Sequence, residues 1–151
     1  METEWIRWLS VADRYAKMDL DRQLAPLGLN SSQHMYVLRI CREPGVQQDQ
    51  LSEIFHIHPS NVTRSIAYLE KEGFLHREQN PRDKRTCRLY PTSRAQQACD
   101  RIAAICENWQ CAVTEDFTDE EIRMLDKLLQ RVVHSALSRA DNQNAGEGGQ
   151  V

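Results

Sequence analysis

The sequence predicts a mainly α protein, in which a compact lobe of helices and a two-stranded hairpin lies between longer helices at the two ends of the chain. Three observations predict this fold class. Apolar residues recur every three or four positions over residues 3–25 and 92–139, which is the spacing of amphipathic helices. A short helical pattern, a tight connection and a second helical pattern lie between about residue 47 and Gly73. Two short alternating segments then flank a polar turn, as in a β-hairpin.

Residues that stop and start helices delimit the first two helices. The apolar stripe over residues 3–25 consists of Trp5, Trp8, Ala12, Tyr15, Ala16, Leu20 and Leu24. Pro26 disfavours helical geometry at the residue before it, so the first helix is predicted to end there. Asn30 is a favourable N-cap, and Gln33 can complete a capping box for a second helix over about 31–42.

The middle of the chain predicts the rest of the lobe. A short helix over about 47–55 precedes a tight connection, and the next helix begins at Pro59, which suits the first helical position because proline has no N–H to satisfy. Gly73 is placed as a C-terminal cap residue. Residues 75–79 and 86–90 alternate as two strands around a polar, basic turn.

Two further helices and a polar tail complete the prediction. A helix over about 92–115 carries one apolar side, and Thr118 to Glu121 form a capping box that opens the last helix. The outer helices are too long and too amphipathic for the lobe to cover them, so we expect a second copy of the chain as their partner. We expect four parts: an N-terminal dimerisation helix (1–28), a winged lobe (29–91), C-terminal dimerisation helices (92–139) and a disordered tail (140–151).

Composition and motifs argue against several classes of protein. The 151 residues contain no apolar run near the ~18 residues of a membrane span. The chain opens with METEWIRW, where a signal peptide needs a basic and then an apolar region, so we expect a cytoplasmic protein. Five cysteines, an odd number without a CxxC pair, argue against a disulfide framework and a zinc ribbon. Because no HExxH, GxSxG, P-loop or dinucleotide motif occurs, we expect neither an enzyme nor a cofactor.

Basic charge is concentrated in one part of an acidic chain. The whole chain has a formal net charge of −3, yet residues 59–90 hold seven Lys/Arg against four Asp/Glu. This distribution suggests one surface that faces a polyanion.

Two groups of side chains in that basic segment are suited to duplex DNA. The helix that begins at Pro59 would offer hydroxyls, an amide and a guanidinium to the major groove through Ser60, Asn61, Thr63 and Arg64. The hairpin tip places three cations around one carboxylate, an arrangement suited to a narrow minor groove, through Arg82, Asp83, Lys84 and Arg85. In each case the alternative is an ordinary solvated helix start or turn.

The stretches 59–64, 69–75 and 81–85, together with Arg77, resemble the MarR (multiple antibiotic resistance regulator) family of winged helix-turn-helix transcription factors. The resemblance runs from about residue 7 to 138. It implies a homodimer on a pseudo-palindromic double-stranded DNA operator, with Ser60, Asn61, Thr63 and Arg64 near the major groove. It also implies that Arg85 enters the minor groove while Asp83 holds it. Asn30 stands where the family usually has Thr, and Ala95 where it usually has Gly, but neither is a DNA-reading residue.

Many members of that family respond to a signal. Peroxide-sensing members use a Cys in the first helix, and here none precedes Cys41. Zinc-sensing members use His on the fifth helix, which has none here, so we expect no metal. The family's commonest device is a small-molecule crevice, which Tyr15, His34, Tyr36 and Arg39 could line for a small aromatic or anionic effector. The alternative is that these four side chains pack or face solvent.

These observations predict a repressor that a small-molecule effector relieves. Two other functions stay open at this point. One is a thiol-redox-responsive regulator, which the five cysteines permit. The other is a winged-helix protein–protein module that does not bind DNA, against which Arg64, Asp83 and Arg85 argue.

Overall fold

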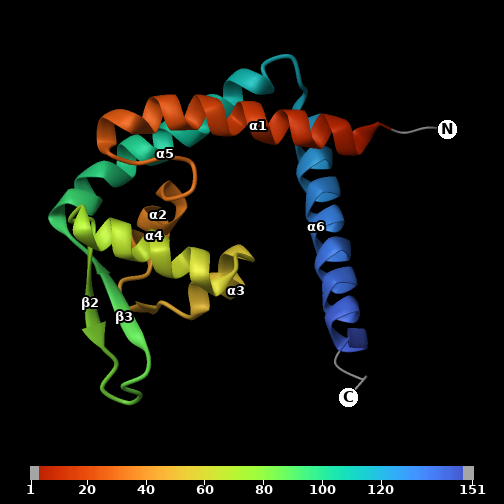
Figure 1. Ribbon diagram of the computed structural model, residues 1–151. Coiled ribbons are helices and arrows are strands. Elements are labelled where there is room, and N and C mark those ends of the chain that lie inside the picture. The colour runs from red at the N-terminus through yellow and green to blue at the C-terminus, as the bar shows by residue number, and fades with distance from the viewer. Residues whose placement is uncertain (1–3, 148–151) are drawn as a thin grey trace. The chain divides into compact units, whose positions relative to one another are not determined.

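The computed structural model describes residues 4–147, which divide into two compact units with the boundary between Gln110 and Cys111. The elements, shown in Figure 1, are α1 (Trp5–Leu24), the 3₁₀ helix η1 (Ala25–Leu27), α2 (His34–Arg42), β1 (Val46–Gln47), α3 (Gln50–Phe55), α4 (Pro59–Lys71), β2 (Leu75–Gln79), β3 (Cys87–Pro91), α5 (Ser93–Val113) and α6 (Asp119–Glu147). This order confirms the predicted mainly α fold with a hairpin between helices. Among the described residues, no helix combines the length and the apolar character needed to cross a bilayer.

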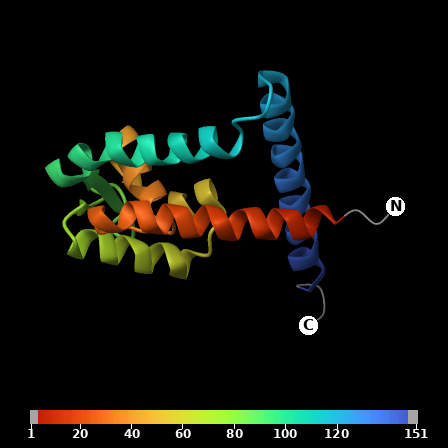
Figure 2. The same cartoon turned by 90° about the horizontal axis from the view of Figure 1, so that it is seen from above.

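The first unit is built around one apolar core, to which all of its α-helices contribute. α1 and α5 run along one side of this unit, and α2 lies beneath them in Figure 1. Figure 2 shows the same unit from above. α4 turns Val62, Ile66 and Leu69 into this core, and each is at most 2% exposed. Their spacing of four and then three residues keeps them on one side of the helix. The opposite side of α4 is therefore left to polar residues.

The wing is a three-stranded antiparallel sheet in the order β1-β3-β2, where the sequence predicted only the β2–β3 hairpin. β2 and β3 pair from Leu75 opposite Pro91 to Gln79 opposite Cys87. β1 adds Val46 opposite Leu89. A strand of two residues has no alternation to recognise in the sequence, which is why it was missed. Because β1 lies just before α3, it attaches the wing to the helices of the lobe.

The start of α2 corrects one prediction, because the helix begins at His34 and not near residue 31. Asn30 Oδ1 accepts a hydrogen bond from the Ser32 N–H at 2.9 Å, and the Asn30 carbonyl accepts from the N–H groups of Gln33 and His34. The capping box predicted for Asn30 and Gln33 is therefore wrong, and Gln33 is an N-cap without a side-chain hydrogen bond. The physical reason is that Asn side chains stabilise turns as readily as helix starts.

The second unit confirms one predicted helix start and corrects one end. Thr118 Oγ1 accepts from the Glu121 N–H at 3.2 Å, and the Glu121 carboxylate accepts from the Thr118 N–H at 2.8 Å, which is the predicted capping box. These bonds lower the pKa of the Glu121 carboxyl. α6 continues to Glu147, although we expected disorder from residue 140. A helix already formed gains a backbone hydrogen bond with each added residue, which explains its extension into a polar segment. Residues 148–151 of the predicted tail lie outside the described residues.

Candidate nucleic-acid interface

α3, a short turn and α4 form the helix-turn-helix of the lobe. The turn is tight because His56 adopts a left-handed conformation with φ of 53°, which is uncommon for a residue other than glycine. His58 caps α4, and Pro59 occupies its first turn. All four side chains predicted to face the major groove are exposed, namely Ser60, Asn61, Thr63 and Arg64. Burial of the apolar side of α4 therefore leaves its polar side facing outward, as the sequence predicted.

The polar groups on this side of α4 are already organised by contacts within the helix. The Thr63 hydroxyl donates to the carbonyl oxygen of Pro59 at 3.0 Å. The Arg64 guanidinium donates to Asn61 Oδ1. These contacts restrict the rotamers of both side chains before any partner arrives, so less conformational entropy is lost when one binds.

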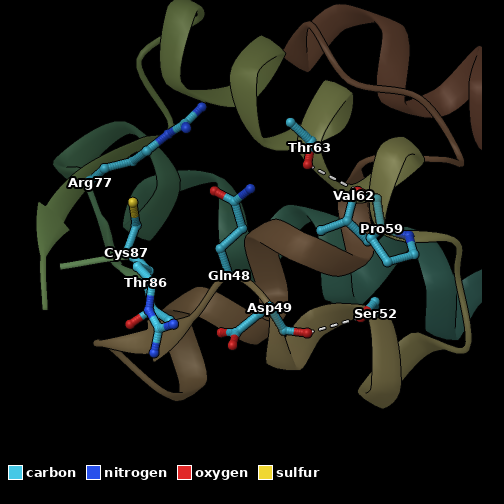
Figure 3. A pocket seen from close by; sticks show the side chains of 10 residues that line it. Gln48, Asp49, Ser52, Pro59, Val62, Thr63, Arg77, Thr86 and Cys87 are labelled. Carbon is cyan, nitrogen blue, oxygen red and sulfur yellow. Dashed lines mark hydrogen bonds between the residues drawn. The ribbon is translucent and has the colours of Figure 1, made fainter. Parts of the chain in front are cut away.

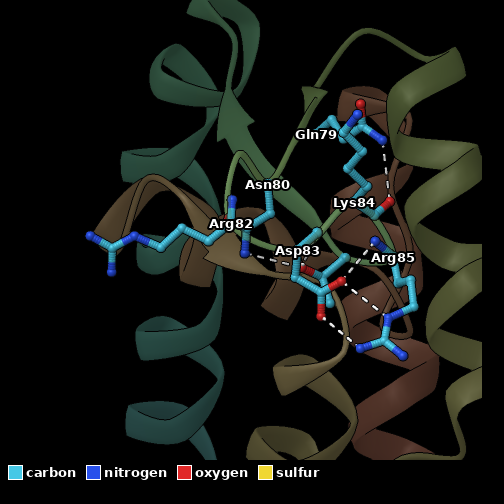
Figure 4. Close-up of polar contacts among 7 residues, drawn as sticks. Gln79, Asn80, Arg82, Asp83, Lys84 and Arg85 are labelled. Carbon is cyan, nitrogen blue, oxygen red and sulfur yellow. Dashed lines mark hydrogen bonds and ion pairs between the residues drawn. The ribbon is translucent and has the colours of Figure 1, made fainter.

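The wing tip brings Asp83 and Arg85 together, as predicted (Figure 4). Asp83 Oδ1 accepts from the backbone N–H of Arg85 at 3.0 Å and from its Nε at 3.2 Å, and Oδ2 lies 3.5 Å from Nη2. These bonds lower the pKa of the Asp83 carboxyl. The Arg85 side chain is nevertheless 90% exposed. Arg82 extends from the opposite side of the turn in Figure 4. The tip thus presents a guanidinium whose direction a neighbouring carboxylate sets.

Asn80 holds the turn in shape and was not identified from the sequence. It is the buried polar residue of the described core, 4% exposed. Its Oδ1 accepts from the Arg82 N–H at 3.0 Å, and its Nδ2 donates to Thr86 Oγ1 at 3.1 Å. These bonds span the hairpin turn from both sides, so Asn80 positions the basic tip. An Asn before a Pro reads as a turn, but nothing in the sequence marks its side chain as buried.

A pocket of about 270 Å³ lies between the helix-turn-helix and the wing (Figure 3). It is lined by Gln48, Asp49, Ser52, Pro59, Val62, Thr63, Arg77, Arg85, Thr86 and Cys87. Gln48 and Arg77 were not predicted as site residues. Arg77 Nε and Glu70 Oε2 form an ion pair 3.0 Å apart. Gln48 Oε1 is buried without a hydrogen-bond partner. Two predicted DNA contacts line the pocket, Thr63 from α4 and Arg85 from the wing tip.

The four residues predicted for an effector crevice lie in different surroundings. Tyr36 is 1% exposed and packs edge-on against Phe55, with ring centres 5.2 Å apart. Tyr15 is exposed on α1, whereas Arg39 is half-buried and ion-paired with Glu43. None of the four lines the pocket beside the wing.

His34 is half-buried and has one ring nitrogen without a partner. Its Nδ1 is buried and makes no hydrogen bond. Burial lowers the pKa of the imidazole, and the nearby backbone of Asn30 and Ser31 and the carboxylate of Asp21 oppose this effect. His34 is therefore neutral at pH 7, which suits hydrogen bonding to a ligand better than charge pairing. Within residues 4–147, no group of three His, Cys, Asp or Glu could hold a metal ion.

Comparisons with known proteins identify relatives of this chain. A family model described as the MarR family matches residues 29–87. The HTH-type transcriptional regulator BilQ of Clostridioides difficile (strain CD3) is 27% identical over 113 residues, which cover 75% of this chain and 76% of that protein. A crystal structure of MarR is 32% identical with a TM-score of 0.75, and the match covers 90% of this chain and 99% of that one. A putative MarR family regulator from Listeria monocytogenes, complexed with 26mer DNA, is 28% identical with a TM-score of 0.86. That match covers 100% of this chain and 98% of the Listeria chain.

Proposed function

This chain belongs to the MarR family of transcriptional regulators, and we propose that it is a homodimeric repressor that binds a pseudo-palindromic operator in a sequence-specific manner. One observation carries the proposal, which is that two separate cationic groups are exposed and held in place on the helix-turn-helix and the wing. Asn61 holds the Arg64 guanidinium, and Asp83 holds that of Arg85.

The two groups suit two different grooves. α4 offers Ser60, Asn61, Thr63 and Arg64 from one exposed side, which is how a recognition helix reads base edges in the major groove. The wing tip offers Arg85 on a narrow turn, and a narrow minor groove concentrates the negative potential that attracts a guanidinium. In this proposal Arg82 and Lys84 contact the phosphates beside it. Base contacts would give specificity, and phosphate contacts most of the affinity.

The apolar side chains on the outer helices support a homodimer. α1 exposes Trp5, Ile6, Trp8, Leu9 and Met18. α6 exposes Ile122, Met124, Leu125, Leu128, Leu129, Val132 and Val133. Soluble proteins rarely leave so much contiguous apolar surface in water, so a partner surface is needed in each unit. A second copy supplies it with two-fold symmetry, and two-fold symmetry is also what a pseudo-palindromic operator requires.

The proposal includes a small aromatic or anionic effector, whose binding would release the repressor from DNA. The neutral His34 would donate or accept one hydrogen bond, and Arg39 would supply a cation once it exchanged Glu43 for the ligand. Tyr15 is accessible to a ligand, whereas Tyr36 could contribute only through a change in the packing of the core.

Titration of duplex DNA at several salt concentrations tests the function. We expect binding whose affinity falls steeply as salt rises, because each neutralised phosphate releases counterions. We expect a duplex with an inverted repeat taken from the region beside the gene to bind at least 10³-fold more tightly than a scrambled duplex. A protein–protein module without DNA binding would shift neither duplex, and that result would exclude the proposal.

A further inference from the structure

The N-cap of α4 is a histidine, and its imidazole contacts the first polar residue of the exposed side. His58 Nδ1 accepts a hydrogen bond from the backbone N–H of Ser60 at 3.2 Å. The same nitrogen lies 2.7 Å from Ser60 Oγ. The backbone N–H and the hydroxyl of Ser60 therefore both contact the same imidazole nitrogen, Nδ1 of His58.

The backbone hydrogen bond decides which group donates in the shorter contact. An imidazole nitrogen accepts only when it carries a lone pair, so the proton of the neutral ring is on Nε2. Because Nδ1 carries no proton, the 2.7 Å contact requires the Ser60 hydroxyl to donate. The hydroxyl hydrogen is then occupied, and Oγ offers only its lone pairs to a partner outside the protein.

The Thr63 hydroxyl also offers only acceptor lone pairs to an outside partner, for a different reason. Its hydroxyl hydrogen is directed to the carbonyl oxygen of Pro59, so its outward lone pairs also only accept. That acceptor is a backbone atom and cannot be removed by substituting a side chain. The acceptor for the Ser60 hydroxyl is the His58 side chain, so a substitution at residue 58 can change whether that hydroxyl donates or accepts outward.

In the major groove, an oxygen that can only accept hydrogen bonds distinguishes the two bases of a base pair. Adenine and cytosine present amino donors there, whereas guanine and thymine present carbonyl acceptors. We propose that His58 is a specificity-determining positioning residue, which fixes the Ser60 hydroxyl as an acceptor and so makes it select adenine or cytosine at the base it meets. This inference rests on the proposed function, because it requires α4 to lie in the major groove.

Selection of binding sites from randomised duplex DNA tests the inference with the full-length protein. Comparison of the wild type with Ser60→Ala first identifies the position that Ser60 reads, as the one whose base preference the variant loses. At that position we expect the wild type to favour adenine or cytosine over guanine or thymine by roughly five- to tenfold, the value of one net hydrogen bond.

Two substitutions of His58 then separate its effect on the Ser60 hydroxyl from its role as the N-cap of α4. His58→Ala releases the hydroxyl, which can now donate to guanine or thymine, so we expect the preference at that position to disappear. His58→Asn keeps an oxygen that accepts from both groups of Ser60 and is a favourable N-cap, so we expect the wild-type preference to return. Thr63→Val is the matched control, because it should change a different position and leave the one that Ser60 reads unaltered. Circular dichroism checks that each variant is folded.

The results separate this inference from the function beneath it. A folded His58→Ala protein that keeps the adenine or cytosine preference at full strength would overturn the inference. So would a His58→Asn protein that binds DNA without that preference, or a Ser60→Ala protein that selects the same sequences as the wild type. Failure of the proposed function would look different, because the wild type itself would then enrich no sequence from the pool.

Discussion

The hydroxyl of Tyr68 on α4 donates a hydrogen bond to the carbonyl oxygen of Gly28, 3.0 Å away in the turn that follows α1. Arg94, at the start of α5, lies beside the same turn, with Nη2 3.4 Å from the carbonyl oxygen of Leu27. The same guanidinium donates to the carbonyl oxygen of Glu72 at the end of α4. Two side chains thus connect the exit of α1 to the helix that carries the candidate DNA-reading residues.

Replacing Tyr68 with Phe should lower the stability of the lobe. The change removes one donor and leaves the Gly28 carbonyl to find water, so we expect the free energy of unfolding to fall by about 0.5–1.5 kcal/mol. Urea denaturation followed by circular dichroism measures it. Tyr15→Phe is the matched control, because that side chain is exposed on α1, and it should leave the midpoint unchanged. Equal stability of both variants would mean that the bond contributes nothing.

The cysteine surroundings predict slow thiol chemistry in the core. Burial, together with the neighbouring Cys99, raises the pKa of Cys41 to about 12, so on the order of one molecule in 10⁵ carries a thiolate there at pH 7. Burial also raises the pKa of Cys106, whereas Cys111 is exposed. Because the thiolate is the reactive form, iodoacetamide should modify the exposed Cys111 first and leave Cys41 unmodified in the folded protein.

Mass spectrometry of tryptic peptides after timed alkylation checks this order. The same reasoning predicts that DNA binding and its release by an effector survive replacement of all five cysteines, apart from some loss of stability at core positions. A folded, DNA-binding variant that no longer responds to its signal would instead support the thiol-redox alternative.

Much of the fold could be predicted because its signals are local. Pro59 marks the start of α4, and the spacing of Val62, Ile66 and Leu69 marks its buried side. The start of α2 could not be predicted, because it depends on a contact between segments distant in the chain. Asp21 on α1 accepts a hydrogen bond from the Ser31 N–H at 2.7 Å, and no pattern within residues 30–33 reveals it.

The candidate site shows the same division between local and tertiary signals. Asp83 and Arg85 are two residues apart, so their pairing follows from the turn between two strands. The burial of Asn80 depends on how the hairpin folds over it, which composition does not encode. His58 was not singled out either, because histidine is not among the residues that usually cap helices.

The apolar side of α6 predicts a dimer that a single charge can weaken. Leu129 is 41% exposed, and an obligate interface that covered it would bury on the order of 2,000 Å² or more in total. We expect the wild type to sediment as a dimer at micromolar concentration and Leu129→Asp to dissociate more readily, because the interface would bury an unpaired carboxylate. His134→Asp is the matched control, since His134 is already polar and exposed on the same helix. A wild-type mass of one chain at all concentrations would exclude the homodimer.

Loss of the Arg64 side chain should weaken DNA binding in a sequence-dependent way. The guanidinium is exposed on α4 and held by Asn61, as expected of a group that reads a base edge. We expect Arg64→Ala to cost about 1–3 kcal/mol on the operator and to relax the preference at particular base pairs. Competition binding with single base-pair variants of the operator measures both effects. A uniform loss on all sequences would reassign Arg64 to phosphate contact.

Arg85→Ala should weaken DNA binding for a different reason, because the minor groove distinguishes bases poorly and its width matters more than base identity. We expect weaker binding to all operators of similar width and a salt dependence whose slope is shallower by roughly 0.9 for each phosphate that the variant no longer neutralises. Asp83→Ala should have a smaller effect in the same direction, since the guanidinium remains but loses the carboxylate that orients it. Arg82→Ala is the matched control for charge alone, because Arg82 extends from the other side of the turn.

Folding should be unaffected in all three wing variants, because Arg85 is 90% exposed and Asn80 keeps the turn in shape. Titration of the operator and of scrambled DNA at several salt concentrations, with circular dichroism as the folding control, separates orientation from charge. If orientation by Asp83 matters, Asp83→Ala lowers affinity even though it removes a negative charge near DNA. If charge alone matters, the same substitution raises affinity, since repulsion of the phosphates falls. The sign of that one change therefore decides whether the Asp83–Arg85 pair acts as a unit.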